Sequence, residues 1–289
     1  RALILALYLN SIGEQVDEHV LSALIQADSV KLFRGVQNSR MFVRFAPENQ
    51  TFEVLPGVNA REALKKFFDP KDVTNSIVSA VRAMEDLRFQ PAFNRVFTEF
   101  MRYTQLKQVI SDFDQQDRFF DQLSELDFCH KHVLFWLQWS MAMRDHKNFP
   151  KADQYLNEAY GRAKSLYDFK THHLDDQRAG LLLDSSTDNE DSATYFARFR
   201  EALTLLKSCI QREEATSHNY LTMRSFSDFC RKAQMKLTKE HRSILISGLT
   251  GLETLVQKKF DNQFSGFVKE SMGEALEVIR TSRGYLKND

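Results

Sequence analysis

Apolar side chains spaced three and four residues apart run through most of this sequence and constrain its fold more than any other feature. Within residues 89–110, for example, Phe93, Phe97 and Phe100 fall on one stripe of a helix. The chain also contains only 10 glycines and 5 prolines in 289 residues, which is too few for the many tight turns of a β-sandwich or barrel. The sequence therefore predicts a mainly α-helical protein.

Prolines mark the places where several of the predicted helices begin. Pro70, Pro91 and Pro150 each open an amphipathic segment, and the first turn of a helix tolerates a residue that has no amide hydrogen. Helices are predicted near residues 73–87, 89–110, 115–126, 131–146, 150–168, 171–184, 191–211, 215–235, 239–261 and 265–285. Because the connections are short, we expect successive helices to form antiparallel hairpins.

The first part of the chain follows a different pattern. Two short helices are predicted at residues 2–12 and from Asp17 onward. The alternating segments 41–46 and 51–55 flank a polar turn, as is typical of a β-hairpin, and a further helix is predicted at residues 58–68. The order helix, helix, hairpin, helix is the order expected of a winged-helix module.

The rest of the chain contains a candidate helical repeat at residues 133–166. A tetratricopeptide (TPR) unit needs large apolar side chains on its first helix and small side chains where its helices cross. The repeat-packing candidates that supply this pattern are Trp136, Trp139, Ser140, Ala152, Leu156 and Ala159. Small residues let two helix backbones approach closely, while tryptophan and leucine fill the space between hairpins. We therefore predict a winged-helix-like α/β module at residues 1–69, followed by a TPR-like α-solenoid of antiparallel helical hairpins at residues 70–289.

Net charge and cysteine content limit the partners and the compartment. Lys and Arg together number 39, as do Asp and Glu, so no global field attracts the chain to nucleic acid or to an anionic membrane. No segment approaches the ~20 apolar residues that span a bilayer. The cysteines, Cys129, Cys209 and Cys230, are far apart and form no CxxC motif. Without a disulfide framework or a zinc motif, the cysteines favour a reducing cytoplasm.

The predicted hairpin suggests an alternative function. Arg40, Phe42 and Arg44 have the composition of a basic and aromatic wing that contacts DNA. Against this, residues 17–28, where a recognition helix is expected, carry three carboxylates and no Arg or Lys, which disfavours phosphate contact. We keep these three side chains as candidate interaction residues. The alternative is a DNA-binding transcription regulator with a helical effector-binding domain.

Motifs that carry catalysis or bind metals are sparse. The sequence has no P-loop (GxxxxGKS or GxxxxGKT) and no GxGxxG, HExxH or GxSxG motif. The best metal candidate consists of two clusters of ligand-type side chains, namely Cys129, His130 and His132, and His172, His173, Asp175 and Asp176. Helix ends and solvated surfaces explain these residues more simply. We therefore expect no catalytic residue, metal or cofactor here, and keep an enzyme with an unfamiliar helical site as a further alternative.

Residues 2–21 and 44–53 at the front, and residues 135–143, 152–160 and 175–183 further on, carry a family resemblance. They resemble the winged helix and the hairpin repeats that follow the nucleotide-binding module of bacterial STAND-type NTPases, including antiviral ones. The resemblance covers about 120 residues in all, and the last 75 or so residues of the chain do not contribute to it.

The resemblance implies a division of labour in a larger protein. In that family the NTPase drives assembly into an oligomer, a separate effector acts, and the helical repeats sense a trigger. This chain would then couple and sense, binding a protein trigger or neighbouring domains of the same polypeptide, with no catalysis of its own. Because the sequence opens on Arg1 in the middle of a predicted helix, we expect it to be a piece of a longer chain.

Overall fold

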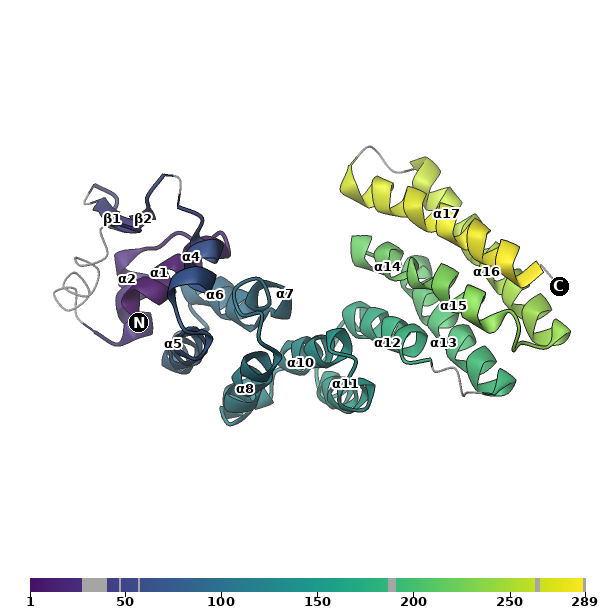
Figure 1. The fold of residues 1–289 in the computed structure, drawn as a ribbon, viewed down its shortest axis with the longest axis horizontal. Helices are drawn as coiled ribbons and strands as arrows, with labels where there is room; N and C mark the ends of the chain where they lie inside the picture. Colours follow the sequence, from purple (N-terminus) through teal and green to yellow (C-terminus); the bar gives the residue numbers. More distant parts are fainter. Residues whose placement is uncertain (28–40, 47, 57, 187–190, 263–265, 288–289) are drawn as a thin grey trace. The chain divides into compact units, whose positions relative to one another are not determined.

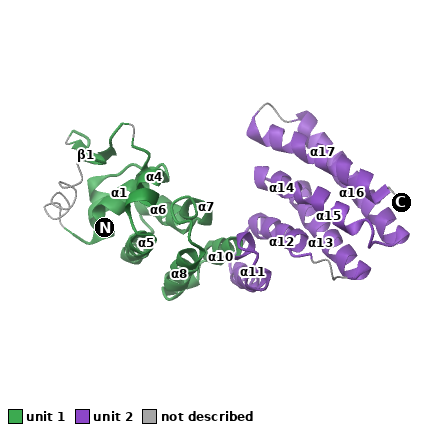
Figure 2. Ribbon diagram, in the orientation of Figure 1, with its two compact units in different colours: residues 1–142 green, residues 143–289 purple. Residues whose placement is uncertain are grey.

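The computed structural model describes residues 1–27, 41–46, 48–56, 58–186, 191–262 and 266–287. The protein is mainly α-helical, as predicted, and the described residues contain one two-stranded antiparallel sheet. The chain divides into two compact units, residues 1–142 and residues 143–289 (Figure 2). The domain boundary expected between residues 69 and 70 lies inside unit 1 and stays a prediction.

Unit 1 begins with two helices, a hairpin and another helix (Figure 1). These elements are α1 (Ala2–Ser11), α2 (Glu18–Ile25), β1 (Val43–Ala46), β2 (Thr51–Val54) and α4 (Ala60–Phe67). Asp17 starts α2, because its carboxylate accepts hydrogen bonds from the amides of His19 at 2.7 Å and Val20 at 3.1 Å. Strands β1 and β2 form the hairpin predicted around the polar turn, and Arg44 lies opposite Glu53 in their pairing.

The segment between α1 and α2 also pairs with β2. The amide of Phe52 donates to the carbonyl of Val16 at 2.8 Å, and the amide of Glu18 donates to the carbonyl of Gln50 at 2.9 Å. A short third segment thus runs antiparallel beside the hairpin. This pairing fixes the start of α2 against the sheet.

The remainder of unit 1 is helical. Its elements are α5 (Pro70–Ala83), α6 (Pro91–Met101), α7 (Tyr103–Leu106), α8 (Phe113–Ser124), α9 (Asp127–His130) and the greater part of α10 (Val133–Asp145). The predicted single helix at residues 89–110 is wrong, because the chain is extended at Arg102. The amide of Tyr103 donates instead to the side-chain oxygen of Gln138 at 2.9 Å, which satisfies that amide outside a continuous helix.

Unit 2 contains seven named helices among its described residues. They are α11 (Phe149–Ala163), α12 (His172–Asp184), α13 (Ser192–Gln211), α14 (Ser217–Thr222), α15 (Ser225–Ala233), α16 (Lys239–Asn262) and α17 (Phe267–Lys287). The predicted helix at residues 215–235 is two helices. At the break, the amides of Arg224 and Phe226 bond to carbonyls three residues back, those of Leu221 and Met223, so the chain tightens between α14 and α15.

The helices of unit 2 lie in two layers. In the first layer α12 contacts α14 and α15, and these contact α17; in the second layer α13 contacts α16 (Figure 1). Asp176 and Asn219 are hydrogen-bonded across 43 residues, and Asp184 and Ser225 across 41 residues. Because the two separations are nearly equal, α12 runs parallel to the α14–α15 pair.

The second layer repeats this relationship. Ser192 bonds to His241 across 49 residues, and Glu213 bonds to Lys259 across 46 residues, so α13 and α16 are also parallel. Helices that contact each other across the two layers run antiparallel. Ser185 bonds to Arg198 across only 13 residues, whereas Asp175 bonds to Arg212 across 37 residues, which makes α12 and α13 an antiparallel hairpin.

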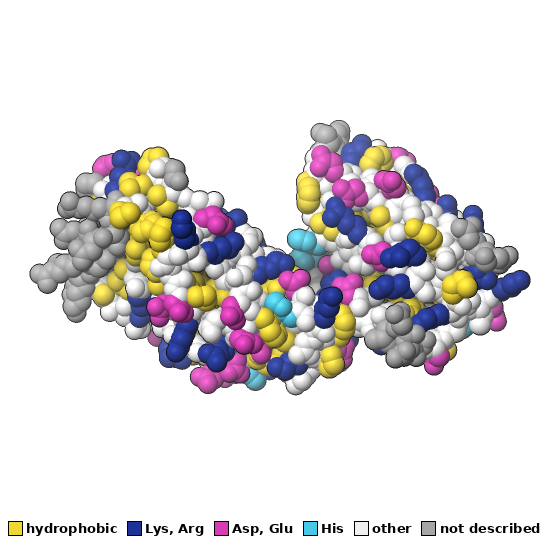
Figure 3. Space-filling model, viewed as in Figure 1, with side chains coloured by type: hydrophobic (Ala, Val, Ile, Leu, Met, Phe, Trp, Pro, Cys, Tyr) yellow, Lys and Arg dark blue, Asp and Glu magenta, His cyan; other side chains and the backbone are white. Residues whose placement is uncertain are grey.

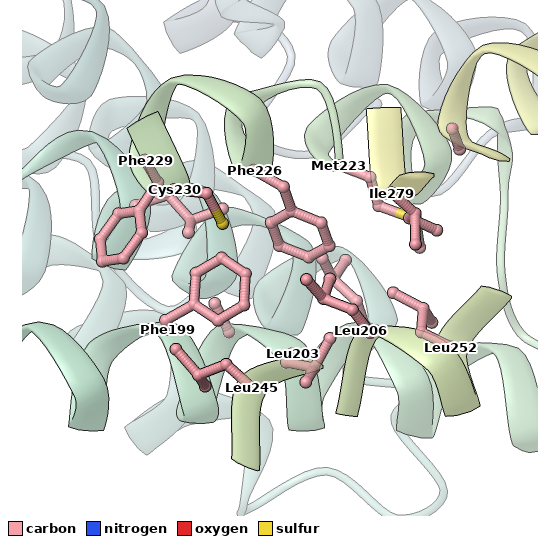
Figure 4. Packing of buried hydrophobic residues seen from close by; sticks show 14 of the residues in the cluster. Phe199, Leu203, Leu206, Met223, Phe226, Phe229, Cys230, Leu245, Leu252 and Ile279 are labelled. Atoms are coloured by element: carbon pink, nitrogen blue, oxygen red, sulfur yellow. The ribbon is translucent and has the colours of Figure 1, made fainter. Parts of the chain in front are cut away.

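The core of unit 2 lies between these layers (Figure 4). Phe199 of α13 packs against Phe226 and Phe229 of α15, with ring centroids 5.0 and 5.1 Å apart. A small residue permits the close approach of α13 and α16, since a Cβ added at Gly248 would lie 2.5 Å from a methyl carbon of Leu203. Apolar packing therefore joins residues beyond 215 to the preceding hairpin.

Candidate interaction site

The six repeat-packing candidates all have buried side chains, three in each compact unit. Trp136, Trp139 and Ser140 are at most 7% exposed in α10, and Ala152, Leu156 and Ala159 are fully buried in α11. The two indole rings stack 5.7 Å apart. Their nitrogens donate to protein acceptors, one to the carbonyl of His130 at 2.7 Å and the other to the carboxylate of Asp117 at 2.9 Å. The indoles are thus core residues, while the predicted hairpin pairing between the two sets stays a prediction.

The wing candidates lie in unit 1, except that Arg40 falls outside the described residues. Arg44 forms an ion pair with Glu53 on the neighbouring strand, with a nitrogen–oxygen distance of 2.7 Å. The ring of Phe42 meets the ring of Phe67 edge-on at 5.4 Å. The charge of Arg44 is therefore balanced within the hairpin.

The predicted metal-ligand residues are distributed over both units. Among the described residues, no three His, Cys, Asp or Glu side chains are grouped so that they could hold a metal ion. In unit 1, burial raises the pKa of the Cys129 thiol to about 12, and burial together with the charge of Arg88 lowers the pKa of His132. Cys129 is fully buried in the core, whereas His132 is half-buried.

No helix of the described chain is long and apolar enough to cross a membrane. On the face shown in Figure 3, basic and acidic side chains are mixed over the surface of each unit, as expected from the balanced composition.

Asp175 of α12 is the centre of a buried polar network in unit 2. Its carboxylate accepts hydrogen bonds from Tyr160 of α11 at 2.8 Å, from Thr171 at 3.0 Å and from Arg212, just after α13, at 2.9 Å. The hydrogen bond to Asp175 is the main reason that the pKa of Arg212 is raised. The carboxylate is only 7% exposed, so the expectation that this residue sits in water is wrong. One side chain thus ties three helices together.

Asp176, the next residue, faces a different set of groups. It accepts a hydrogen bond from Asn219 at 3.3 Å, and the oxygen of Asn219 caps α14 by accepting from the amide of Thr216 at 2.8 Å. Burial raises the pKa of Asp176, and this effect is opposed by a hydrogen bond from Thr222 and by the charges of Arg144, His218 and His172. Adjacent carboxylates therefore have unlike environments.

Arg144, the first basic residue of unit 2, lies against the backbone of α12. Its guanidinium donates to Gln177 at 3.1 Å and forms an ion pair with Asp184 at 2.8 Å. A Cβ added at Gly180 would lie 2.1 Å from a nitrogen of this guanidinium. Glycine thus allows the charged group to rest on the helix.

A groove with a volume of about 560 Å³ runs between α11, α12 and α13. The residues that line it are Phe149, Pro150, Asp153, Arg178, Leu181, Leu182, Ser185 and Arg198. Arg178 pairs with Asp153 and Asn157, and its guanidinium carbon lies 5.6 Å from the ring centroid of Tyr160. Arg198 donates to the hydroxyl of Ser185. The groove therefore combines an apolar surface with two guanidinium groups.

Sequence reasoning missed both the groove and the network. The signal for the network is a helix that buries Asp175 and Gln177 between apolar residues, which a search for apolar stripes ignores. The groove has no local signal, since its lining comes from three helices.

Comparisons of this chain with protein-family models, curated proteins and solved structures give no match.

Proposed function

We propose that this chain is the sensing and coupling region of a STAND-type NTPase in bacterial antiviral defence, and that it works in the cytoplasm. In this proposal the stacked helices of unit 2 bind a protein trigger, the front module relays the nucleotide state, and catalysis is performed by other parts of the polypeptide. The family resemblance of the front segment and the hairpin segments suggests this role.

The single observation that carries the proposal is the two-layer packing of unit 2. Neighbouring helices within a layer are parallel, helices in opposite layers are antiparallel, and cross-layer packing buries one continuous core. Stacked hairpins of this kind form extended surfaces that bind other proteins. Hydrogen-bonded residues on neighbouring helices of a layer are 41 to 50 residues apart in the sequence. These separations exceed the 34 residues of a TPR and are nearer the roughly 40–47 residues of other helical repeats.

The front module agrees with the winged-helix interpretation in its element order. The third extended segment, at Val16 to Glu18, pairs with the hairpin between the first two helices. DNA binding is less well supported. Arg44 is ion-paired with Glu53, whereas contact with DNA phosphates requires basic side chains whose charge is not already balanced by a carboxylate.

The reading frame that encodes this chain tests the proposal directly. A P-loop followed by a downstream acidic motif should be encoded upstream of Arg1. The backbone amides and the lysine of a P-loop bind the phosphates of the nucleotide. In the full-length product, addition of a non-hydrolysable ATP analogue should change amide hydrogen exchange in the front module. An upstream sequence that encodes no P-loop would refute the proposal.

A further inference from the structure

We draw no further inference here: the strongest candidate, the groove between α11, α12 and α13, has both of its arginines already bonded to neighbouring side chains, and nothing in the described part of the chain shows what would occupy it.

Discussion

The phenolic hydroxyl of Tyr160 on α11 donates a hydrogen bond to the carboxylate of Asp175 on α12, with an oxygen–oxygen distance of 2.8 Å. The same carboxylate binds Arg212, so it joins one hairpin to the end of the next helix. Asp176, one residue on, has Asn219 as its partner at 3.3 Å, and burial raises its pKa. We therefore expect the two adjacent carboxylates to affect the stability of unit 2 in opposite directions.

Replacement of the first carboxylate should destabilise unit 2. Asp175→Asn removes the negative charge that faces Arg212 and weakens the hydrogen bonds from Tyr160 and Thr171. We expect the free energy of unfolding to fall by about 2 kcal/mol, the usual range for hydrogen bonds to a charged group. Urea unfolding monitored by hydrogen exchange of α11, α12 and α13 measures this loss, and a change below about 0.5 kcal/mol would show that the network is dispensable.

Replacement of the second carboxylate should do the reverse. Because burial raises the pKa of Asp176, its contribution to stability is fully present below its unfolded pKa of about 4 and is lost as pH rises through the higher folded pKa. Asp176→Asn keeps a hydrogen-bonding side chain without a buried charge. It should leave unit 2 at least as stable as wild type at pH 7, by up to about 1 kcal/mol.

The pH dependence separates this effect from a general change in packing. Urea denaturation of both proteins at several pH values between 4 and 8 gives the unfolding free energy at each pH. This free energy should decline for wild type as the pH rises, and the decline should be smaller in Asp176→Asn. Equal pH profiles would mean that the environment of Asp176 is not what burial implies.

The close contact between α13 and α16 predicts a steric effect. Gly248→Ala brings a Cβ within 2.5 Å of a Leu203 methyl carbon, and overpacking of this kind costs about 1–3 kcal/mol. Gly161→Ala in α11 is the matched control, because nothing lies within 4 Å of the added Cβ. The control should be stabilised by about 0.5–1 kcal/mol through its better helix propensity. Thermal unfolding that ranks the two variants in the opposite order would contradict the packing of the layers.

The ion pair of the hairpin predicts little change when it is removed. The side chains of Arg44 and Glu53 are 63% and 39% exposed, and exposed pairs contribute about 1 kcal/mol or less. Arg44→Ala should therefore change the unfolding free energy of unit 1 by no more than about that amount. It should also leave retention on a DNA column unchanged at low salt. A large loss of salt-sensitive retention would restore the DNA-binding alternative.

Features set by neighbouring residues were predictable from the sequence. Pro70, Pro91 and Pro150 open helices as expected, because a helix start is decided within one turn. The break at Arg102 was not predictable, since the acceptor of the Tyr103 amide, the side-chain oxygen of Gln138, lies 35 residues away in the sequence. The burial of Asp175 likewise depends on Arg212, 37 residues away. The site was missed because its partners meet only after the helices have packed.

The two tryptophans of this chain, Trp136 and Trp139, both lie on α10 within unit 1. Indole emission therefore reports on the surroundings of α10, whereas far-ultraviolet circular dichroism records the helices of both units. If the units melt independently, the two signals will have different midpoints in the same sample; coincident midpoints would mean that the chain unfolds as one cooperative body.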